Sequence, residues 1–172
     1  METSLEAFEA IFRATYDDLL RFAMRRVGPD SAADVVADVF LVAWRRRADI
    51  PADAPRLWLF GVASKVVSNH RRGELRRAQL LQKAAAEPAI EVSVDASTVV
   101  IERAFDTLTD PDREVLRLTE WERLSAGEAA VVLGCSTAAF RVRLHRARRR
   151  LAAAVLAAEP SRTAKDSQDV IA

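Results

Sequence analysis

Cysteine is almost absent from this sequence of 172 residues, in which Cys135 is the single example. One thiol excludes an internal disulfide and any metal site built from several cysteines. Glycine and proline are also scarce, with five and six residues, whereas alanine, leucine, valine and arginine are abundant. Because glycine and proline are the poorest helix formers, this composition favours an all-α protein.

Long apolar runs are missing as well. The longest, Leu151 to Ala158, is far shorter than the roughly 20 residues that span a bilayer. The first ten residues, METSLEAFEA, are acidic and lack the basic and apolar regions of a signal peptide. We therefore expect a cytoplasmic protein that does not insert into membranes.

Groupings of catalytic residues are also missing. The sequence has no glycine-rich phosphate loop, no cysteine–histidine pair and no nucleophile beside a base. The two histidines, His70 and His145, are far apart and have few potential metal ligands near them. We therefore predict no catalytic residues, no metal site, no cofactor and no enzymatic activity.

Positive charge is concentrated in two segments. Residues 65–83 carry six bases and one acid, and residues 141–150 carry six arginines and no acid. Between them, residues 84–140 carry eleven acids and four bases, although the whole chain has a formal net charge of only +1. Many helices simply end in arginine or lysine. Two separate basic segments nevertheless indicate two anion-binding surfaces, as in a nucleic-acid-binding protein.

Helical periodicity divides the N-terminal half into three segments. The first, 5–27, has one apolar stripe: Phe8, Phe12, Tyr16, Leu19, Ala23 and Val27. Gly28-Pro29 should end it, and Ser31 should cap a second helix over about 31–47. A loop over 48–56 follows. A third helix should begin near Pro55, with Gly73 as its weakest helix former.

The C-terminal half begins after a stretch without periodicity. Residues 84–98 hold a proline and three acids and are expected to form a flexible linker. The sequence therefore predicts two small helical domains, 1–83 and 99–157, and a disordered tail over 158–172. Thr109 should cap one helix, with Pro111 just inside its start.

A helix-turn-helix is predicted next. Ser125 should cap a helix over 126–133, Gly134 should end it, and Ser136 should cap a second helix. One arc of this second helix is apolar and should face the core: Phe140, Leu144, Ala147 and Leu151. The opposite arc holds Ala138, Val142, His145 and Arg149. Such a helix can enter a DNA major groove and place flanking arginines near phosphates.

The motifs in both halves resemble bacterial sigma factors. LTDPDREVLRLTEWERLSAGEAAVVLGCSTAAFRVRLHRARRRL (108–151) is similar to sigma region 4, AADVVADVFLVAW (32–44) to region 2.2, and PRLWLFGVASKVVSNHRR (55–72) to regions 2.3 and 2.4. The two-domain layout, over about residues 5–157, resembles the extracytoplasmic-function type. Ala37, Lys65, Asn69, Ala139 and Val142 depart from residues common in the family, which leaves the promoter sequence open.

The resemblance implies a role for each surface. The second helix would dock on the β′ clamp helices of core RNA polymerase through Asp34, Val35, Asp38, Val39 and Leu41. The −10 promoter element would be read by the loop 48–56 and the third helix, through Arg56, Trp58, Lys65, Asn69, Arg71, Arg72, Arg76 and Arg77. The −35 element would contact Thr137, Ala138, Arg141, Val142, His145, Arg146, Arg148 and Arg149. The β flap of the polymerase and an anti-sigma factor are further implied partners.

Some residues and the function itself keep a second interpretation. Asp34 could compensate the helix dipole, and a tryptophan in an apolar helical pattern such as that of Trp58 more often lies in a core. The chain could also be a helix-turn-helix regulator that binds DNA without polymerase. A helical nucleic-acid enzyme or an RNA-binding scaffold is a third alternative. The sequence predicts a sigma factor that directs transcription initiation at the promoters of a specific regulon.

Overall fold

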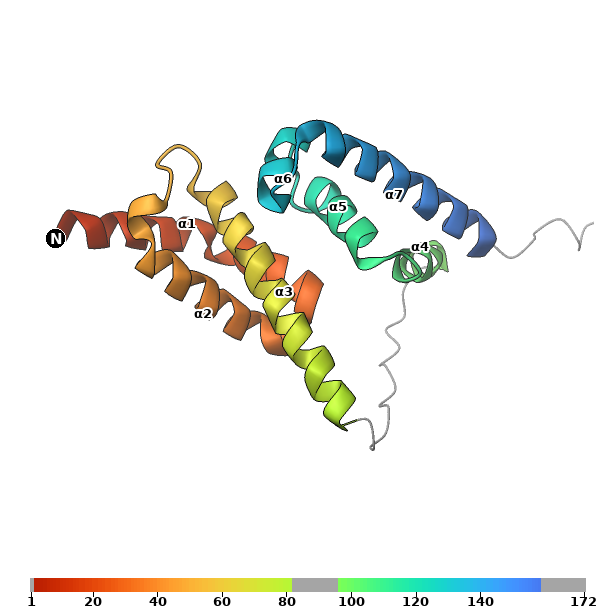
Figure 1. Ribbon diagram of the computed structural model, residues 1–172, viewed down its shortest axis with the longest axis horizontal. Coiled ribbons are helices and arrows are strands. Elements are labelled where there is room, and N and C mark those ends of the chain that lie inside the picture. The colour runs from red at the N-terminus through yellow and green to blue at the C-terminus, as the bar shows by residue number, and fades with distance from the viewer. Residues whose placement is uncertain (1, 82–95, 159–172) are drawn as a thin grey trace, which may run out of the picture. The chain divides into compact units, whose positions relative to one another are not determined.

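The computed structural model describes residues 2–81 and 96–158, and every regular element in these ranges is helical. The all-α prediction is therefore confirmed. The chain divides into two compact units. One contains helices α1 (Glu2–Val27), α2 (Pro29–Arg45) and α3 (Pro55–Leu81), together with the short 3₁₀ helix η1 (Arg47–Asp49) (Figure 1). The other contains α4 (Ala96–Asp106), α5 (Asp110–Glu120) and α7 (Thr137–Ala158), and α6 (Ala126–Leu133) precedes α7.

The N-terminal unit is held together by one apolar core among three helices. The rings of Phe22 on α1 and Phe60 on α3 stack at 5.1 Å and are fully buried. Phe40 on α2 packs against Phe12 on α1, with 4.5 Å between ring centroids. The remaining buried apolar residues of this unit are Leu19, Ala23, Ala32, Val35, Val36, Val39, Ala43, Leu59, Val62, Ala63 and Val67. Burial of apolar area on this scale is the main force that fixes the three helices together.

The junction between α1 and α2 corrects one prediction. Gly28 has φ +79°, which glycine adopts without strain, and it ends α1 as predicted. The second helix, however, begins at Pro29 and not after Ser31. Proline needs no hydrogen-bond partner for its nitrogen and has a fixed helical φ, so it starts the helix two residues earlier. The acid on the first turn is therefore Asp30, and Asp34 lies one turn further on.

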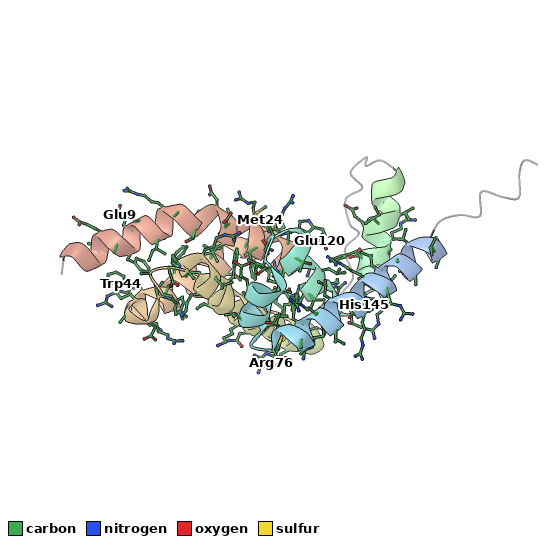
Figure 2. All side chains as sticks on the ribbon, turned by 90° about the horizontal axis from the view of Figure 1, so that it is seen from above. Glu9, Met24, Trp44, Arg76, Glu120 and His145 are labelled. Atoms are coloured by element: carbon green, nitrogen blue, oxygen red, sulfur yellow. The ribbon has the colours of Figure 1, made fainter. Side chains whose placement is uncertain are left out.

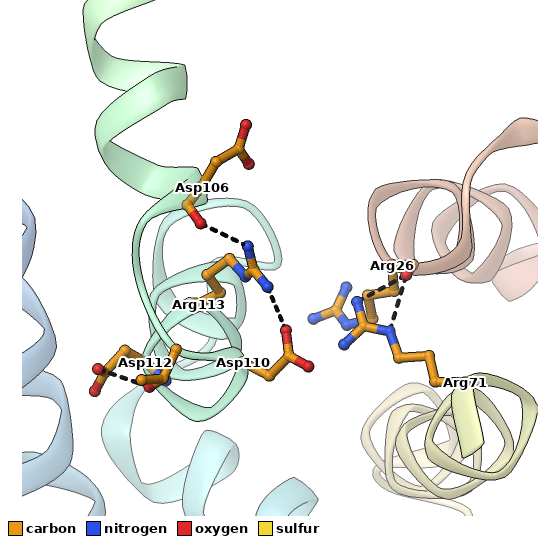
Figure 3. A network of polar contacts seen from close by, with 7 residues as sticks. Arg26, Arg71, Asp106, Asp110, Asp112 and Arg113 are labelled. Carbon is orange, nitrogen blue, oxygen red and sulfur yellow. Dashed lines mark hydrogen bonds and ion pairs between the residues drawn. The ribbon is translucent and has the colours of Figure 1, made fainter. Parts of the chain in front are cut away.

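In the C-terminal unit α7 packs against both α4 and α5, and its Phe140 is fully buried. Thr109 caps α5 as predicted, because its hydroxyl accepts from the backbone N–H of Asp112 and Pro111 lies in the first turn. Arg113 ties the end of α4 to the start of α5 through the carbonyl of Asp106 at 3.1 Å and the carboxylate of Asp110 (Figure 3). The other buried apolar residues of α4, α5 and α7 are Ala104, Val115, Leu116, Leu118, Leu144 and Ala147, and Leu108 in the turn between α4 and α5 is buried as well.

The predicted linker differs from the structure at its C-terminal end. Residues 96–98 belong to α4, so the helix begins three residues earlier than predicted. Residues 84–95 of the linker and residues 159–172 of the predicted tail lie outside the described part of the chain, and Ala158 is the last residue of α7. In the N-terminal unit, α3 continues through Gly73 without a break.

Candidate nucleic-acid and polymerase interfaces

The turn between α6 and α7 has the geometry that the sequence predicts. Ser125 and Glu128 form a reciprocal capping box at the start of α6, with bonds of 2.8 and 3.3 Å. Gly134 ends α6 with φ +64°. The hydroxyl of Ser136 then accepts from the backbone N–H of Ala139 at 3.2 Å and caps α7. Two capped helices joined by so short a turn form a helix-turn-helix.

The second helix of this motif has two faces, as predicted. Phe140, Leu144 and Ala147 are buried, and Leu151 is half-buried. Thr137 is half-buried at the first turn. The other predicted −35 residues are all exposed: Ala138, Arg141, Val142, His145 (labelled in Figure 2), Arg146, Arg148 and Arg149. The exposed face is small or apolar at its centre and basic at its edges, which suits a helix that enters a major groove.

Two arginines of α7 bond to acids of α5. Arg148 pairs with Glu120 at 2.8 Å, and Arg150 pairs with Asp112 at 2.6 Å. The Asp112 side chain is only 9% exposed and also accepts from the hydroxyl of Thr109. A carboxylate this buried needs its cation, because an unpaired buried charge is costly. Arg150 therefore anchors α7 to α5, a role that the sequence did not suggest.

In the N-terminal unit, two of the predicted −10 residues on α3 bond to α1. The guanidinium of Arg56 donates to Asp18 on α1 at 2.6 Å and lies over the Phe60 ring at 4.5 Å. Asp18 also accepts from Arg21 at 2.7 Å. Partial burial alone would raise the pKa of Asp18, but the hydrogen bonds from Arg56 and Arg21 outweigh it and hold that pKa below its ordinary value. Arg56 thus fastens the start of α3 to α1.

Arg71 makes the second internal tie. Its Nε and Nη2 both donate to the backbone carbonyl of Arg26, at 3.0 and 2.7 Å (Figure 3). That carbonyl lies in the last turn of α1, where carbonyls have no partner within their own helix. Arg71 therefore caps α1 from α3. Arg56 and Arg71 both have a structural role, and the DNA contact that the sequence predicts for them stays a prediction.

Four of the other predicted −10 residues form an exposed stripe on α3. At about 100° per residue, Lys65, Asn69, Arg72 and Arg76 share one face of the helix, and all four are exposed. Asn69, Arg72, Leu75 and Arg76 line a shallow hollow, and Arg76 is labelled in Figure 2. Arg72 donates to the side-chain oxygen of Asn69, and Arg77 is exposed beside the stripe. We call Lys65, Asn69, Arg72 and Arg76 the α3 stripe.

Trp58 lies on the same face, about two turns before Lys65. It is half-buried, so it is neither a full core residue nor a free platform. Arg46, at the end of α2, lies over its ring with 5.5 Å between the guanidinium carbon and the ring centroid. Arg46 was not among the site residues predicted from the sequence. The available signal was a run of three arginines, 45–47, directly before the predicted loop.

The outward face of α2 holds part of the predicted polymerase-binding set. Asp34 and Asp38 are exposed, and Leu41 is 54% exposed. Val35 and Val39, by contrast, are 1% and 0% exposed. They fall on the stripe of α2 that packs into the core. They therefore lie beneath the exposed face and cannot contact a partner directly. We call Asp34, Asp38 and Leu41 the α2 docking face.

Within residues 2–81 and 96–158, no group of three or more His, Cys, Asp or Glu side chains could hold a metal ion. None of the helices over the same described residues combines the length and the hydropathy that crossing a bilayer requires.

Comparison with known proteins agrees with this geometry. Residues 11–77 match the sigma-70 region 2 family, and residues 98–151 match the sigma-70 region 4 family. The chain is 33% identical over 147 residues to the ECF RNA polymerase sigma factor SigC of Mycobacterium tuberculosis. The matched region covers 83% of this chain and 80% of SigC.

Solved structures share the fold. The sigma factor RpoE from Bartonella quintana, solved in complex with the anti-sigma factor NepR, matches with a TM-score of 0.68 and 24% identity over 89% of this chain and 98% of its own. CnrH, solved in complex with the cytosolic domain of CnrY, matches with a TM-score of 0.62 and 26% identity over 91% and 96% of the two chains. Since both sigma-70 regions match in order, and SigC is related over most of its length, the chain belongs to the extracytoplasmic-function (ECF) family of RNA polymerase sigma factors.

Proposed function

We propose that this chain binds core RNA polymerase, recognises the −35 and −10 elements of a set of promoters, helps to open the duplex and so directs transcription initiation. The observation that carries the proposal is the two-faced helix α7 behind a capped turn, in one chain with the α3 stripe. The chemistry of RNA synthesis belongs to the polymerase. This chain contributes sequence recognition and carries out no catalytic step.

The −35 element is the duplex ligand of α7. A major groove admits one α-helix, whose first turns contact base edges. Arg141, Val142 and His145 lie centrally on the exposed face, whereas Arg146 and Arg149 lie at positions suited to phosphates. Arg148 can reach a phosphate only by leaving Glu120. Its contribution to DNA binding is therefore smaller than that of the unpaired positions on the exposed face.

The −10 element is the single-stranded ligand of the N-terminal unit. The α3 stripe offers three cations and one amide along a single helix face. Such a face can follow the phosphates of one strand while bases are taken out of the stack. Because a base in a duplex is paired and stacked, this surface should prefer DNA that is already unpaired at −10.

The α2 docking face is the contact for core polymerase. Its two carboxylates lie one turn apart on an exposed helix face, with Leu41 beside them as an apolar anchor. Carboxylates in this arrangement suit arginines on a partner helix. We assign this partner as the β′ clamp helices, and the β flap as the partner of the C-terminal unit.

An anti-sigma factor is a further proposed partner, since RpoE and CnrH were both solved with a bound protein, named as an anti-sigma factor in the case of RpoE. Such a protein would hold the chain away from polymerase until a signal releases it. Binding to core polymerase and to chromosomal DNA places the proposed function in the cytoplasm.

A binding experiment distinguishes the proposed sigma factor from the alternative, a helix-turn-helix regulator that acts without polymerase. DNA ligands are selected from a random library by the protein together with core polymerase, and each ligand is then tested with the protein alone, with core polymerase alone and with both. The proposal predicts sequence-specific binding only in the mixture, or at least tenfold tighter binding there. Equally tight and specific binding by the protein alone would favour the regulator.

A further inference from the structure

Arg123, in the turn between α5 and α6, has a left-handed backbone conformation with φ +58°. Within residues 2–81 and 96–158, φ is also positive at Gly28 and Gly134, and at no other position. Glycine adopts this conformation freely, whereas the Cβ of any other residue comes too close to the backbone carbonyl that follows. The chain therefore keeps an arginine at a position where glycine would be more stable.

The neighbours of Arg123 hold it in this conformation. Glu122 and Leu124, on either side, are only 3% and 6% exposed. The N–H of Glu122 donates to the carbonyl of Arg117 at 3.1 Å, and the N–H of Leu124 donates to the carbonyl of Leu118 at 3.0 Å. Because burial and both hydrogen bonds fix the turn, Arg123 cannot relax to a right-handed conformation without breaking it.

The side chain of Arg123 does not explain why the position is an arginine. It is exposed, and within the described part of the chain no hydrogen bond or ion pair engages it. The two arginines of α5 differ in this respect, since Arg113 pairs with Asp110 and Arg117 lies over the ring of Phe105 at 5.3 Å. A strained backbone beneath an exposed, unbonded side chain is typical of a residue kept for function.

The ion pair between Glu120 and Arg148 shows which surface Arg123 adjoins. Glu120, labelled in Figure 2, lies three residues before Arg123 and bonds to Arg148 of α7 at 2.8 Å. Arg148 lies two turns after Arg141 on the same edge of α7. Three residues span at most about 10 Å, so Arg123 lies close to this edge. Since Glu120 neutralises Arg148, Arg123 restores a positive charge there.

Arg123 also lies directly before the helix-turn-helix. The first helix of the motif, α6, begins at Ala126. In a motif bound to DNA, the first helix crosses the sugar-phosphate backbone beside the groove that the second helix enters. A cation at the entry to α6 is therefore placed for the backbone and not for base edges.

We propose that Arg123 is a phosphate-binding residue of the −35 site, kept there at the expense of stability. The inference rests on the proposed function and adds a residue outside the recognition helix. The guanidinium group donates two parallel hydrogen bonds to phosphate oxygens, which suits it to this contact. Because the phosphate is the same at every base pair, Arg123 strengthens binding without reading sequence.

The test combines stability with DNA binding. Core polymerase and the full-length protein are titrated with duplex DNA that carries an intact or a scrambled −35 element, at several salt concentrations. Arg123→Gly should weaken binding to both duplexes by about three- to tenfold and lower the slope of log K against log salt by about 0.9, the share of one phosphate. The same variant should raise the midpoint temperature of unfolding by about 4 °C, because relief of the left-handed strain exceeds the entropy that glycine adds to the unfolded chain.

Three further variants separate charge from loop geometry. Arg123→Lys keeps the charge and the strain, and should bind within about twofold of the wild type with the same salt slope. Arg123→Asn tolerates the left-handed conformation without the freedom of glycine, and should bind as weakly as Arg123→Gly. Arg103→Ala removes an exposed arginine of α4 in the same unit and should leave the salt slope unchanged. An unchanged slope in Arg123→Gly, or equal losses in Arg123→Lys and Arg123→Gly, would overturn the inference.

A contact with polymerase is the other explanation of weaker binding. The affinity of each variant for core polymerase is therefore measured without DNA. The phosphate assignment predicts no change there, and a loss equal to the loss on DNA would overturn it in favour of a protein partner. If the wild type with core polymerase does not prefer the intact −35 element to the scrambled one, the proposed −35 function itself fails.

Discussion

Arg71 on α3 donates two hydrogen bonds to the backbone carbonyl of Arg26, at 3.0 and 2.7 Å, and so closes the C-terminal end of α1. This contact distinguishes the role of Arg71 from that of Arg72, the next residue in sequence, which is exposed. Both belong to one basic run, and yet one supports the fold and the other faces solvent.

Replacement of these two arginines should therefore have different effects. Arg71→Ala should lower the free energy of unfolding by about 1–3 kcal/mol, because it leaves a carbonyl without its charged partner. Arg72→Ala should change stability by less than about 0.5 kcal/mol. It should instead lower the slope of log K against log salt for single-stranded DNA by about 0.7, the contribution of one phosphate contact. Urea unfolding and fork binding at several salt concentrations measure the two effects. Equal losses of stability would show that the contact with Arg26 has no special role.

Asp18 gives a prediction about pH. The pKa of Asp18 lies below its ordinary value of 3.8 in the folded chain, so the unfolded chain binds this proton more tightly. The stabilisation by Asp18 is therefore complete above about pH 3.8 and is lost as the pH falls through the folded pKa. Asp18→Asn should be less stable than the wild type at pH 6, and the difference should shrink below pH 4. Urea unfolding at pH 6, 4 and 3 measures it, and a constant difference would refute the assignment.

Arg141 and Arg149 should differ in what they recognise. Arg141 lies near the N-terminal end of α7, where bases are reached, so Arg141→Ala should cost about 1–3 kcal/mol at the −35 element and reduce selectivity there. Arg149→Ala should weaken binding to all sequences alike and lower the salt slope by about one unit. Competition binding with intact and scrambled −35 elements, at two salt concentrations, compares them. Unchanged −35 selectivity in Arg141→Ala would remove it from the base-reading set.

Val142 should recognise a thymine methyl group. It is 50% exposed at the centre of the recognition face, and an apolar side chain in a major groove finds its partner in that methyl. Replacing each −35 thymine in turn by deoxyuridine removes one methyl at a time. One replacement should weaken binding of the wild type about threefold, on the order of one buried methyl group, and should have no effect on Val142→Ala. If the wild type tolerates every replacement, Val142 does not make this contact.

The sequence predicted local features well and long-range partners poorly. The caps at Thr109, Ser125 and Ser136 depend on residues three positions apart, and each is confirmed. The cap at Ser31 was wrong because Pro29, two residues earlier, starts the same helix more favourably. The two faces of α7 follow from helical periodicity alone.

The site residues that changed role did so through tertiary contacts. Arg56 meets Asp18 from 38 positions away, and Arg71 meets Arg26 from 45 positions away. No local pattern distinguishes these arginines from exposed ones. Val35 and Val39 lie on the buried apolar stripe of α2 with Val36, Phe40 and Ala43, so helical periodicity already favoured their burial over that of Asp34 and Asp38. Arg46 was missed because its partner, Trp58, lies beyond a loop whose path the sequence does not specify.

Run-off transcription with purified core polymerase shows whether the chain directs initiation at a promoter. Templates carry a promoter selected with this protein, either intact or with the −35 or the −10 element scrambled. A sigma factor should give a single transcript that requires the protein, core polymerase and both elements. The charge reversals Asp34→Arg and Asp38→Arg together should reduce its yield at least tenfold. Transcription that ignores both elements, or no transcript from a template that the mixture binds, would contradict the proposed function.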